Sequence, residues 1–175
     1  MKVRSLILLS IFSVGGLMAR VPEKSVVVLP VKAVHVSPTG VETPFNAGLN
    51  LERGMRSILE SRGTSVRSLP SAPVPASIDS ETIGNLAKSA GADMVYVTEV
   101  RLMESEKPFG DLTAAFCGEA SETLAARGKI LLSIRAFSAA GKLLWSSESA
   151  EPYRCAEPVV EVWSQMMTAL EKAPL

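Results

Sequence analysis

Few residues in this chain are of the types that commonly carry out catalysis. The 175 residues include one histidine, His35, and two cysteines, Cys117 and Cys155. A serine or cysteine nucleophile needs a base such as histidine, and no serine lies in a Gly-x-Ser-x-Gly sequence. No spacing of His35 with the two cysteines matches a zinc motif, and the glycines form no phosphate-binding loop. The sequence therefore predicts no catalytic residue, no metal site and no cofactor, and an enzyme that uses His35 remains only a third hypothesis.

The first residues have the pattern of a secretory signal peptide. Lys2 and Arg4 precede an uncharged apolar run from Ser5 to Met18, and a small residue, Ala19, follows. This order of a basic region, an apolar region and a small residue predicts export with cleavage near Ala19. The alternative is an uncleaved anchor, although the run is shorter than the ~20 residues that a spanning helix needs. We therefore expect a periplasmic or secreted bacterial protein with residues 1–19 as its signal.

Export decides how the two cysteines are interpreted. An even number of cysteines in an exported protein favours a disulfide, here between Cys117 and Cys155. The closed loop would contribute roughly 3 to 4 kcal/mol in the chain-entropy model. The alternative is two separate thiols, one of them buried as a small apolar side chain.

Charge argues against nucleic acid and anionic lipid as partners. The chain has 18 basic and 18 acidic side chains, and loss of Lys2 and Arg4 with the signal would leave 16 basic ones. A nearly neutral chain without a basic cluster lacks the electrostatic footprint of nucleic-acid binding. The partner is therefore expected to be a protein, and any association with the membrane to be indirect or through an uncleaved signal.

The long segment 104–126 is the most unusual part of the sequence. Loops of this length in a compact domain are commonly functional or mobile. Phe109, Asp111 and Phe116 lie in its polar surroundings, where an aromatic side chain gains little unless something covers it. We expect these three residues to bind a partner, with folding back onto the domain as the alternative. Glu104 and Glu106 could form an acid and base pair, but charges in a loop are usually solvated.

The elements that must position these residues follow from periodicity. Residues 25–35 predict a strand, which Pro30 can break. A helix from Ala47 to Arg62 is expected to end at Gly63, and a weak edge strand at 64–69 follows. Asp79 is expected to cap a second helix that ends at Gly91, and Met94 to Val97 predicts a strand covered on both faces.

The second half alternates between apolar and polar residues. From Thr98 onward Val100 and Leu102 share one side and Glu99 and Arg101 the other, so that end of the strand is expected to be half exposed. Residues 127–138 and 142–147 predict a hairpin, with Glu151-Pro152 as a strand break, and a last helix follows Pro158. Trp163, Met166 and Met167 of that helix are expected to lie in the core, with an adaptable docking face as the alternative. The order β-α-β-α-β-β-β-α predicts one α/β domain, residues 20–175, with a mixed sheet of about five strands.

The chain resembles a known group at this level. Four segments are similar to TolB amino-terminal-like domains. They are the strand that ends in Leu29-Pro30, the helix that ends at Gly63, the segment from Leu86 to Val97 and the hairpin around Gly141-Lys142-Leu143-Leu144-Trp145-Ser146. That family of bacterial envelope domains includes the CsgG-like and LpoB-like proteins. The resemblance covers about Ser25 to Ser149 and implies a domain that docks on other proteins, with no catalytic residues. Unlike many members, this chain lacks the cysteine of a lipoprotein, and Ser138-Ala139-Ala140 replaces the acidic residue common before the hairpin glycine.

These observations predict an exported, non-enzymatic accessory protein of the cell envelope. It would dock on an envelope protein through the segment 104–126 or through an exposed sheet edge. The alternative is a periplasmic protein that binds a small molecule or a peptidoglycan fragment in a pocket between the sheet and that segment.

Overall fold

A computed structural model of the chain describes residues 24–69, 78–105, 127–154 and 158–174. The elements in chain order are β1 Ser25–Val28, β2 Lys32–Val36, β3 Glu42–Pro44, α1 Gly48–Ser61, β4 Ser65–Arg67, α2 Ser80–Ala90, β5 Met94–Glu104, β6 Gly128–Ser138, β7 Leu143–Tyr153 and α3 Val159–Glu171. No helix within the described ranges is long and apolar enough to cross a membrane.

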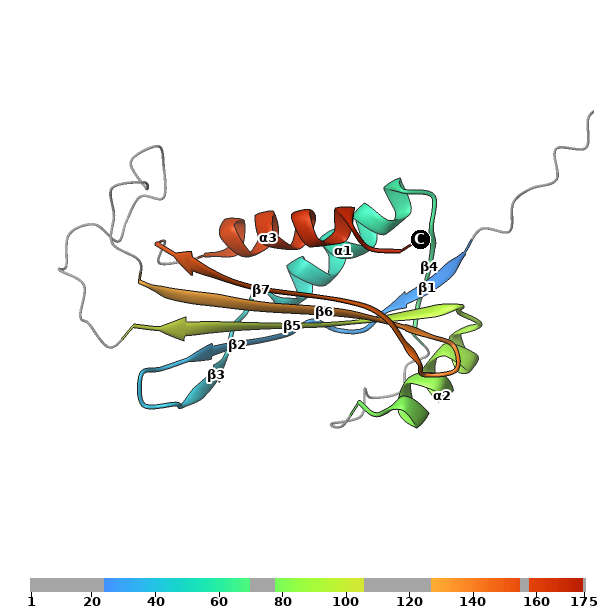
Figure 1. The fold of residues 1–175 in the computed structure, drawn as a ribbon, viewed down its shortest axis with the longest axis horizontal. Helices are drawn as coiled ribbons and strands as arrows, with labels where there is room; N and C mark the ends of the chain where they lie inside the picture. Colours follow the sequence, from blue (N-terminus) through green and yellow to red (C-terminus); the bar gives the residue numbers. More distant parts are fainter. Residues whose placement is uncertain (1–23, 70–77, 106–126, 155–157, 175) are drawn as a thin grey trace, which may run out of the picture.

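All the strands belong to one mixed sheet with β5 at its centre (Figure 1). On one side β5 pairs with β6 and β6 with β7, each in antiparallel orientation. On the other side β5 runs parallel to both β1 and β2, while β4 extends the sheet beside β1 and β3 beside β2. The predicted α/β fold with a mixed sheet is confirmed, although the sheet has seven strands instead of about five.

Pro30 breaks the first strand as predicted, and the break shifts its register. Val28 of β1 lies opposite Tyr96, whereas Lys32 of β2 lies opposite Glu99. Lys32 is therefore four residues after Val28, whereas Glu99 is only three residues after Tyr96 on β5. Because side chains alternate between faces, this one extra residue reverses the side to which β2 side chains point.

Two details of the sheet differ from the sequence prediction. Strand β3 was not expected, since Glu42–Pro44 is short, polar and exposed. Strand β7 does not end at Glu151-Pro152 but continues to Tyr153, with Pro152 opposite Lys129. An edge strand tolerates proline because the N–H that proline lacks would point to solvent and is not needed for pairing with a neighbouring strand.

Helices cover the two faces of the sheet unequally. α1 and α3 lie on one face, over a core that includes Val26, Tyr96, Leu102, Ile130 and Ile134. α2 lies on the other face, where Ile83 and Ala87 pack on Val27, Val95 and Val97 near one end of the sheet. Met94 to Val97 is therefore buried from both sides, as predicted.

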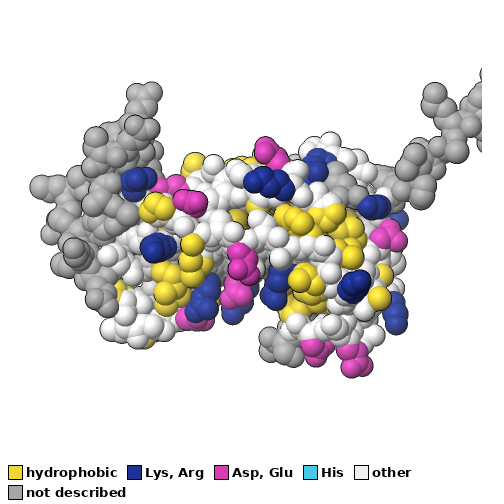
Figure 2. Space-filling model, viewed as in Figure 1, with side chains coloured by type: hydrophobic (Ala, Val, Ile, Leu, Met, Phe, Trp, Pro, Cys, Tyr) yellow, Lys and Arg dark blue, Asp and Glu magenta, His cyan; other side chains and the backbone are white. Residues whose placement is uncertain are grey.

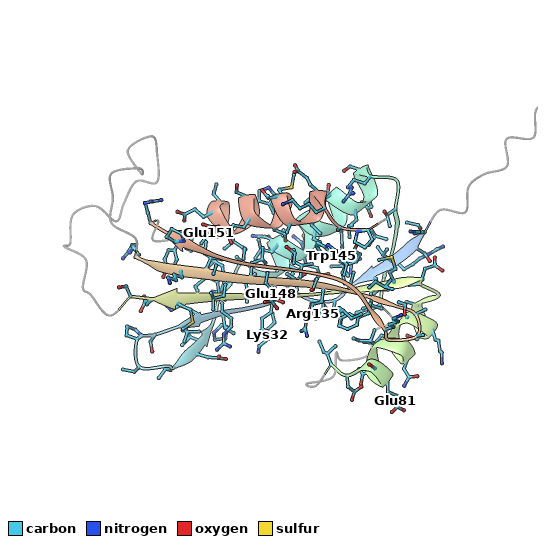
Figure 3. The ribbon with its side chains drawn as sticks, viewed as in Figure 1. Lys32, Glu81, Arg135, Trp145, Glu148 and Glu151 are labelled. Atoms are coloured by element: carbon cyan, nitrogen blue, oxygen red, sulfur yellow. The ribbon has the colours of Figure 1, made fainter. Side chains whose placement is uncertain are left out.

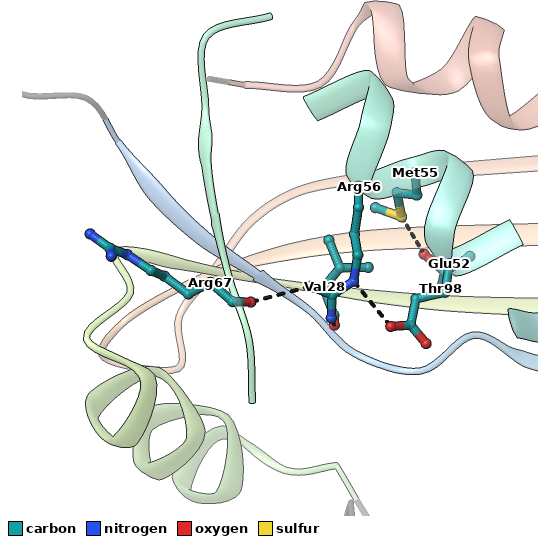
Figure 4. Close-up of polar contacts among 6 residues, drawn as sticks. All are labelled: Val28, Glu52, Met55, Arg56, Arg67 and Thr98. Atoms are coloured by element: carbon teal, nitrogen blue, oxygen red, sulfur yellow. Dashed lines mark hydrogen bonds and ion pairs between the residues drawn. The ribbon is translucent and has the colours of Figure 1, made fainter. Parts of the chain in front are cut away.

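Polar contacts hold α1 over the junction of β1 and β4. Arg56 donates to the carbonyl of Val28 at 3.3 Å and to the carbonyl of Arg67 at 3.4 Å, and its Nε–H donates to Glu52 at 3.1 Å (Figure 4). Thr98 of β5 donates to the sulfur of Met55 at 3.4 Å. The carbonyl at the end of β1 thus finds a donor where the strand breaks.

The expected boundaries of α2 are also present. The N–H of Thr82 donates to Asp79 Oδ1 at 2.8 Å, which is the N-cap bond that the sequence predicted. Gly91 ends the helix with a φ of 62°. Because Met94 follows only three residues after Gly91, the end of α2 sets where β5 begins.

Candidate functional site

One part of the sheet has no helix over it. On the side that carries α2, the sheet continues past Val97 without cover from another described element (Figure 1). We call this part the uncovered face. It consists of Lys32 and Val34 from β2, Glu99, Arg101 and Met103 from β5, Lys129, Leu131, Ser133 and Arg135 from β6, and Glu148 and Ala150 from β7.

Strand register places these residues on one side. Lys32 lies opposite Glu99, Glu99 opposite Ser133, and Ser133 opposite Glu148, which gives one polar row across four strands. In β6, and in β5 from Thr98 onward, every second side chain is buried and those between are only half-buried or exposed. Figure 2 shows a hollow below the middle of the sheet, with acidic and basic side chains gathered around it. In Figure 3, Lys32, Arg135 and Glu148 lie in this region.

The next row across the sheet is more apolar. Val34 lies opposite Arg101, which lies opposite Leu131, and Leu131 lies opposite Ala150. Glu99, Arg101, Leu131, Glu148 and Ala150 line a shallow pocket of about 310 Å³ on this face. The uncovered face therefore has an apolar centre with charges around it.

The charges on this face are only partly paired. Lys32 Nζ lies 3.2 Å from Glu99, and Arg101 forms an ion pair with Glu42. The guanidinium of Arg135 lies over the ring of Phe137 at 5.9 Å. The buried Nε atoms of Arg101 and Arg135 have no hydrogen-bond partner within the described ranges. Such a donor costs roughly 1 to 3 kcal/mol unless an acceptor reaches it.

A second candidate site is a pocket at the opposite face, which we call the end pocket. It has a volume of about 490 Å³ and lies among β2, β3, α1 and α3. His35, Thr43, Phe45, Asn46, Asn50 and Tyr153 are among its lining residues. His35 Nε2 lies 3.2 Å from Glu104 Oε1, so the only histidine of the chain pairs with the last residue of β5.

Tyr153 closes the floor of the end pocket. Burial raises the pKa of its hydroxyl, and the nearby Glu104 and Glu161 carboxylates raise it further while Arg127 opposes them. The tyrosine therefore stays protonated at neutral pH and can donate a hydrogen bond. The pocket offers amide, imidazole and hydroxyl groups beside an aromatic ring, which suits the binding of a neutral polar molecule.

The helix surface holds a smaller apolar hollow. Met166 is fully buried and Trp163 packs on the same core, as the sequence predicted, whereas Met167 is half-buried and does not belong to that core. Leu51, Gly54, Val159 and Trp163 line this hollow between α1 and α3. None of these four residues has a side chain of a type that commonly carries out catalysis.

The residues that the sequence singled out for binding are not tested by the structure. Phe109, Asp111, Phe116 and both cysteines, Cys117 and Cys155, lie outside the described residues, as do Glu106 and the predicted signal 1–19. Only Glu104 and Ser105 of segment 104–126 are described, and the N–H of Ser105 donates to the carbonyl of Arg127, just beyond the segment, at 2.9 Å. In the described part of the chain no three His, Cys, Asp or Glu side chains are grouped as metal ligands would be.

Sequence reasoning named neither the uncovered face nor the end pocket by its residues. The signal for the first was present, since Glu99 and Arg101 alternate with Val100 and Leu102 and the expected half exposure of this end of β5 is confirmed. Alternation alone does not tell whether a helix covers the polar side. The end pocket had no local signal, because its lining comes from elements far apart in the chain.

Comparisons with known proteins give low similarities. No protein-family model and no curated protein matches the chain. Among solved structures, the LpoB C-terminal domain from Escherichia coli is 13% identical, with a TM-score of 0.45 over 73% of this chain and 81% of that chain. The LpoB C-terminal domain from Salmonella enterica is 14% identical, with a TM-score of 0.44 over 75% and 85% of the two chains. The hypothetical protein CT253 from Chlamydia trachomatis is 15% identical, with a TM-score of 0.40 over 74% and 72%.

Two of these three structures are LpoB domains, a group that the resemblance stated from the sequence also named. The comparisons do not support the TolB and CsgG parts of it. At these identities and TM-scores they establish neither a family nor a function for this chain.

Proposed function

We propose that the chain is an exported, non-enzymatic accessory module that docks on another protein of the bacterial envelope through the uncovered face. The observation that carries this proposal is the run of half-buried and exposed side chains, apolar and charged, on β2, β5, β6 and β7 that no described helix covers. A sheet face of this kind normally packs against another layer. A partner protein would supply that layer here.

The composition of the face favours a protein partner. Leu131, Val34 and Met103 supply an apolar centre, and Lys32, Glu148 and Lys129 stand around it. Protein interfaces commonly combine an apolar centre with a polar rim. The mixed signs of charge favour a folded surface of matching pattern over a uniformly charged polymer.

The two arginines indicate what the partner must offer. Arg101 and Arg135 each hold a buried Nε–H without an acceptor in the described part of the chain. Each arginine is half-buried, and the accessible N–H groups of its guanidinium can donate charge-assisted hydrogen bonds to carboxylates of a partner. We therefore propose that acidic side chains of the partner lie opposite Arg101 and Arg135.

Site-specific photo-crosslinking in cells tests this function. A photoreactive amino acid at Ser133 or Ala150 probes the uncovered face, and one at Ser57, exposed on α1, serves as the control position. The expected result is an adduct with one envelope protein from Ser133 and Ala150 and no such adduct from Ser57. Leu131→Glu is expected to abolish the adduct while the protein accumulates normally.

Two results would reject the proposed face. One is an absence of adducts from Ser133 and Ala150 in cells that contain the folded protein. The other is the same adduct pattern from Ser57, which would indicate contact without a defined surface.

The end pocket favours a second candidate function, the binding of a small molecule or a peptidoglycan fragment. Its support is the pocket of about 490 Å³ that brings His35, Asn46, Asn50 and Tyr153 together. Isothermal titration with muramyl peptides and disaccharide fragments tests it. Binding that Asn50→Leu weakens at least tenfold would support this function, and the absence of heat with every fragment would reject it.

A further inference from the structure

Strand β7 and helix α3 enclose a groove at the outer edge of the sheet. The groove has a volume of about 290 Å³, and its walls include Ser147, Ser149 and Glu151 from β7 and Gln165, Thr168 and Lys172 from α3. Ser149 donates a hydrogen bond to Gln165 Oε1 at 2.9 Å, which joins the two walls at one point. A strand edge beside a helix is the geometry in which an extended peptide can add to a sheet.

The edge of β7 is open for such an addition. β7 is 11 residues long and pairs only with β6 among the described strands. Exposed edges in natural proteins are commonly protected by charged side chains, especially lysine, by proline, by bulges or by covering elements. β7 has no lysine, its one proline, Pro152, is next to its last residue, and its register shift lies at Ala136/Phe137, near the hairpin turn and away from the groove. Ser146, Ser147, Ser149 and Ala150 are small and leave space for a neighbouring strand.

The charges of β7 are all of one sign. Glu148 and Glu151 are exposed, and neither forms an ion pair with the described part of the chain. Glu151 lies opposite Ile130, on the face that α3 covers, whereas Glu148 lies opposite Ser133 on the uncovered face. Figure 3 shows the two carboxylates on β7, with Glu151 toward α3. Residues three positions apart on a strand point to opposite faces, so the edge carries one carboxylate on each side.

We propose that an extended segment of a partner protein adds to the edge of β7 as a further strand and carries two basic residues three positions apart. One basic side chain would pair with Glu148 on the uncovered face and the other with Glu151 beside α3. Opposite charges on facing positions of neighbouring strands stabilise their pairing, and like charges weaken it. The residues of the segment that point toward Gln165 and Thr168 must be small or polar to fit the groove.

A second copy of this chain is a poor occupant of the same edge. Two β7 strands side by side would bring Glu148 and Glu151 of both copies to one seam without a basic residue on either strand. Repulsion among these four carboxylates disfavours that pairing. The charge pattern therefore selects a different chain. This inference builds on the proposed docking function and shares Glu148 with the uncovered face, but it concerns the outer edge of β7, so each can fail while the other stands.

Hydrogen–deuterium exchange and fluorescence anisotropy with synthetic peptides test the inference on the full chain. The probe is a nine-residue peptide of alternating threonine and valine with lysine at positions 3 and 6. We expect it to bind and to slow amide exchange in residues 143–153 at least fivefold. The same peptide with lysines at positions 3 and 5 places both charges on one face, and we expect it to bind at least tenfold more weakly.

Two further comparisons separate strand addition from attraction of charge alone. A peptide with N-methyl groups on its inward-facing amides keeps both lysines but cannot form the backbone hydrogen bonds, and we expect no protection of β7. The double variant E148K/E151K is expected to bind the first peptide at least tenfold more weakly. The matched control E60K/E81K makes the same change of charge on exposed sites of α1 and α2 and is expected to bind as the parent does.

Several results would overturn the inference. These are no binding of the first peptide, equal binding of all the peptides, equal loss in both double variants, or protection confined to residues outside β7. Protection of β7 that rises with protein concentration in the absence of peptide would also overturn it, because a second copy would then be the occupant. The crosslinking at Ser133, which lies on β6, does not depend on any of these outcomes, whereas Ala150 lies on β7 and would also report a strand added at its edge.

Discussion

Gly54 of α1 lies directly against the indole of Trp163 of α3. A Cβ atom added at Gly54 would stand 2.0 Å from two carbons of the six-membered ring, which is far inside any van der Waals contact. The absence of a side chain at this point of α1 therefore sets how closely the two helices approach. Because α1 and α3 together cover one face of the sheet, this contact also fixes how α3 lies on β6 and β7.

Gly54→Ala is expected to destabilise the fold. The added methyl group must displace Trp163 or separate the helices, and such overpacking typically costs about 1 to 3 kcal/mol. Urea unfolding followed by circular dichroism measures the loss. Ser57→Ala, an exposed position of the same helix, is the control and should change the free energy of unfolding by less than about 0.5 kcal/mol. If Gly54→Ala were as stable as Ser57→Ala, the contact would not limit the helix spacing.

Gly84→Ala in α2 is expected to have the opposite effect. A Cβ at Gly84 would meet its nearest atom, the carbonyl oxygen of Ala139, at 3.5 Å, an ordinary contact. Alanine has the better helix propensity, so the variant should be more stable by about 0.5 to 1 kcal/mol. The same unfolding measurement applies. Gly141→Ala is the contrasting variant, since its φ is 76° and its Cβ would lie 2.1 Å from the carbonyl oxygen of Ser80. It should destabilise the protein.

Tyr96 should make the fold sensitive to alkali. Burial raises the pKa of its hydroxyl from 10.0 to about 12, with Arg62 opposing the shift, and the hydroxyl donates to the carbonyl of Pro174 at 2.8 Å. Because the folded-state pKa is the higher one, this contribution is complete below pH 10 and is lost as the pH rises through about 12. The urea midpoint should fall over this range. Tyr96→Phe should remove the part of the pH dependence due to Tyr96 and cost about 1 kcal/mol at neutral pH.

Asp93 should make the start of the sheet sensitive to acid. Its Oδ2 accepts hydrogen bonds from the N–H of Ser25 at 2.9 Å and from the Ser25 hydroxyl at 2.8 Å. These bonds, the backbone one first, lower the pKa of the carboxyl below 3.8. The stabilisation is therefore present above pH 3.8 and is lost as the pH falls through the lower folded-state value. Asp93→Asn should be less stable at pH 6 and should lose less stability between pH 5 and pH 2 than the parent, as chemical unfolding at each pH would measure.

Much of the secondary structure could be predicted from local patterns. Asp79 and Gly91 bound α2 because a cap and a left-handed glycine act within a few residues. Met94 to Val97 forms a strand covered on both sides, and Glu99 to Leu102 alternates as expected. Strand β3 and the continuation of β7 past Pro152 escaped prediction because each depends on a neighbouring strand and on an open edge.

The sequence by itself determined where the helices and most of the strands form, that Met94 to Val97 is covered on both faces, and that one side of the second half of β5 is polar. Only the tertiary structure decided which surfaces remain open. One extra residue at Pro30 turns His35 toward Leu102 and the end pocket, while Lys32 joins Glu99 on the uncovered face. The physical reason is that side-chain direction on a strand depends on register with its neighbour, which local propensity does not set. The carboxylates of Glu148 and Glu151 likewise lie along an open edge only because β7 is the outermost strand on its side of the sheet.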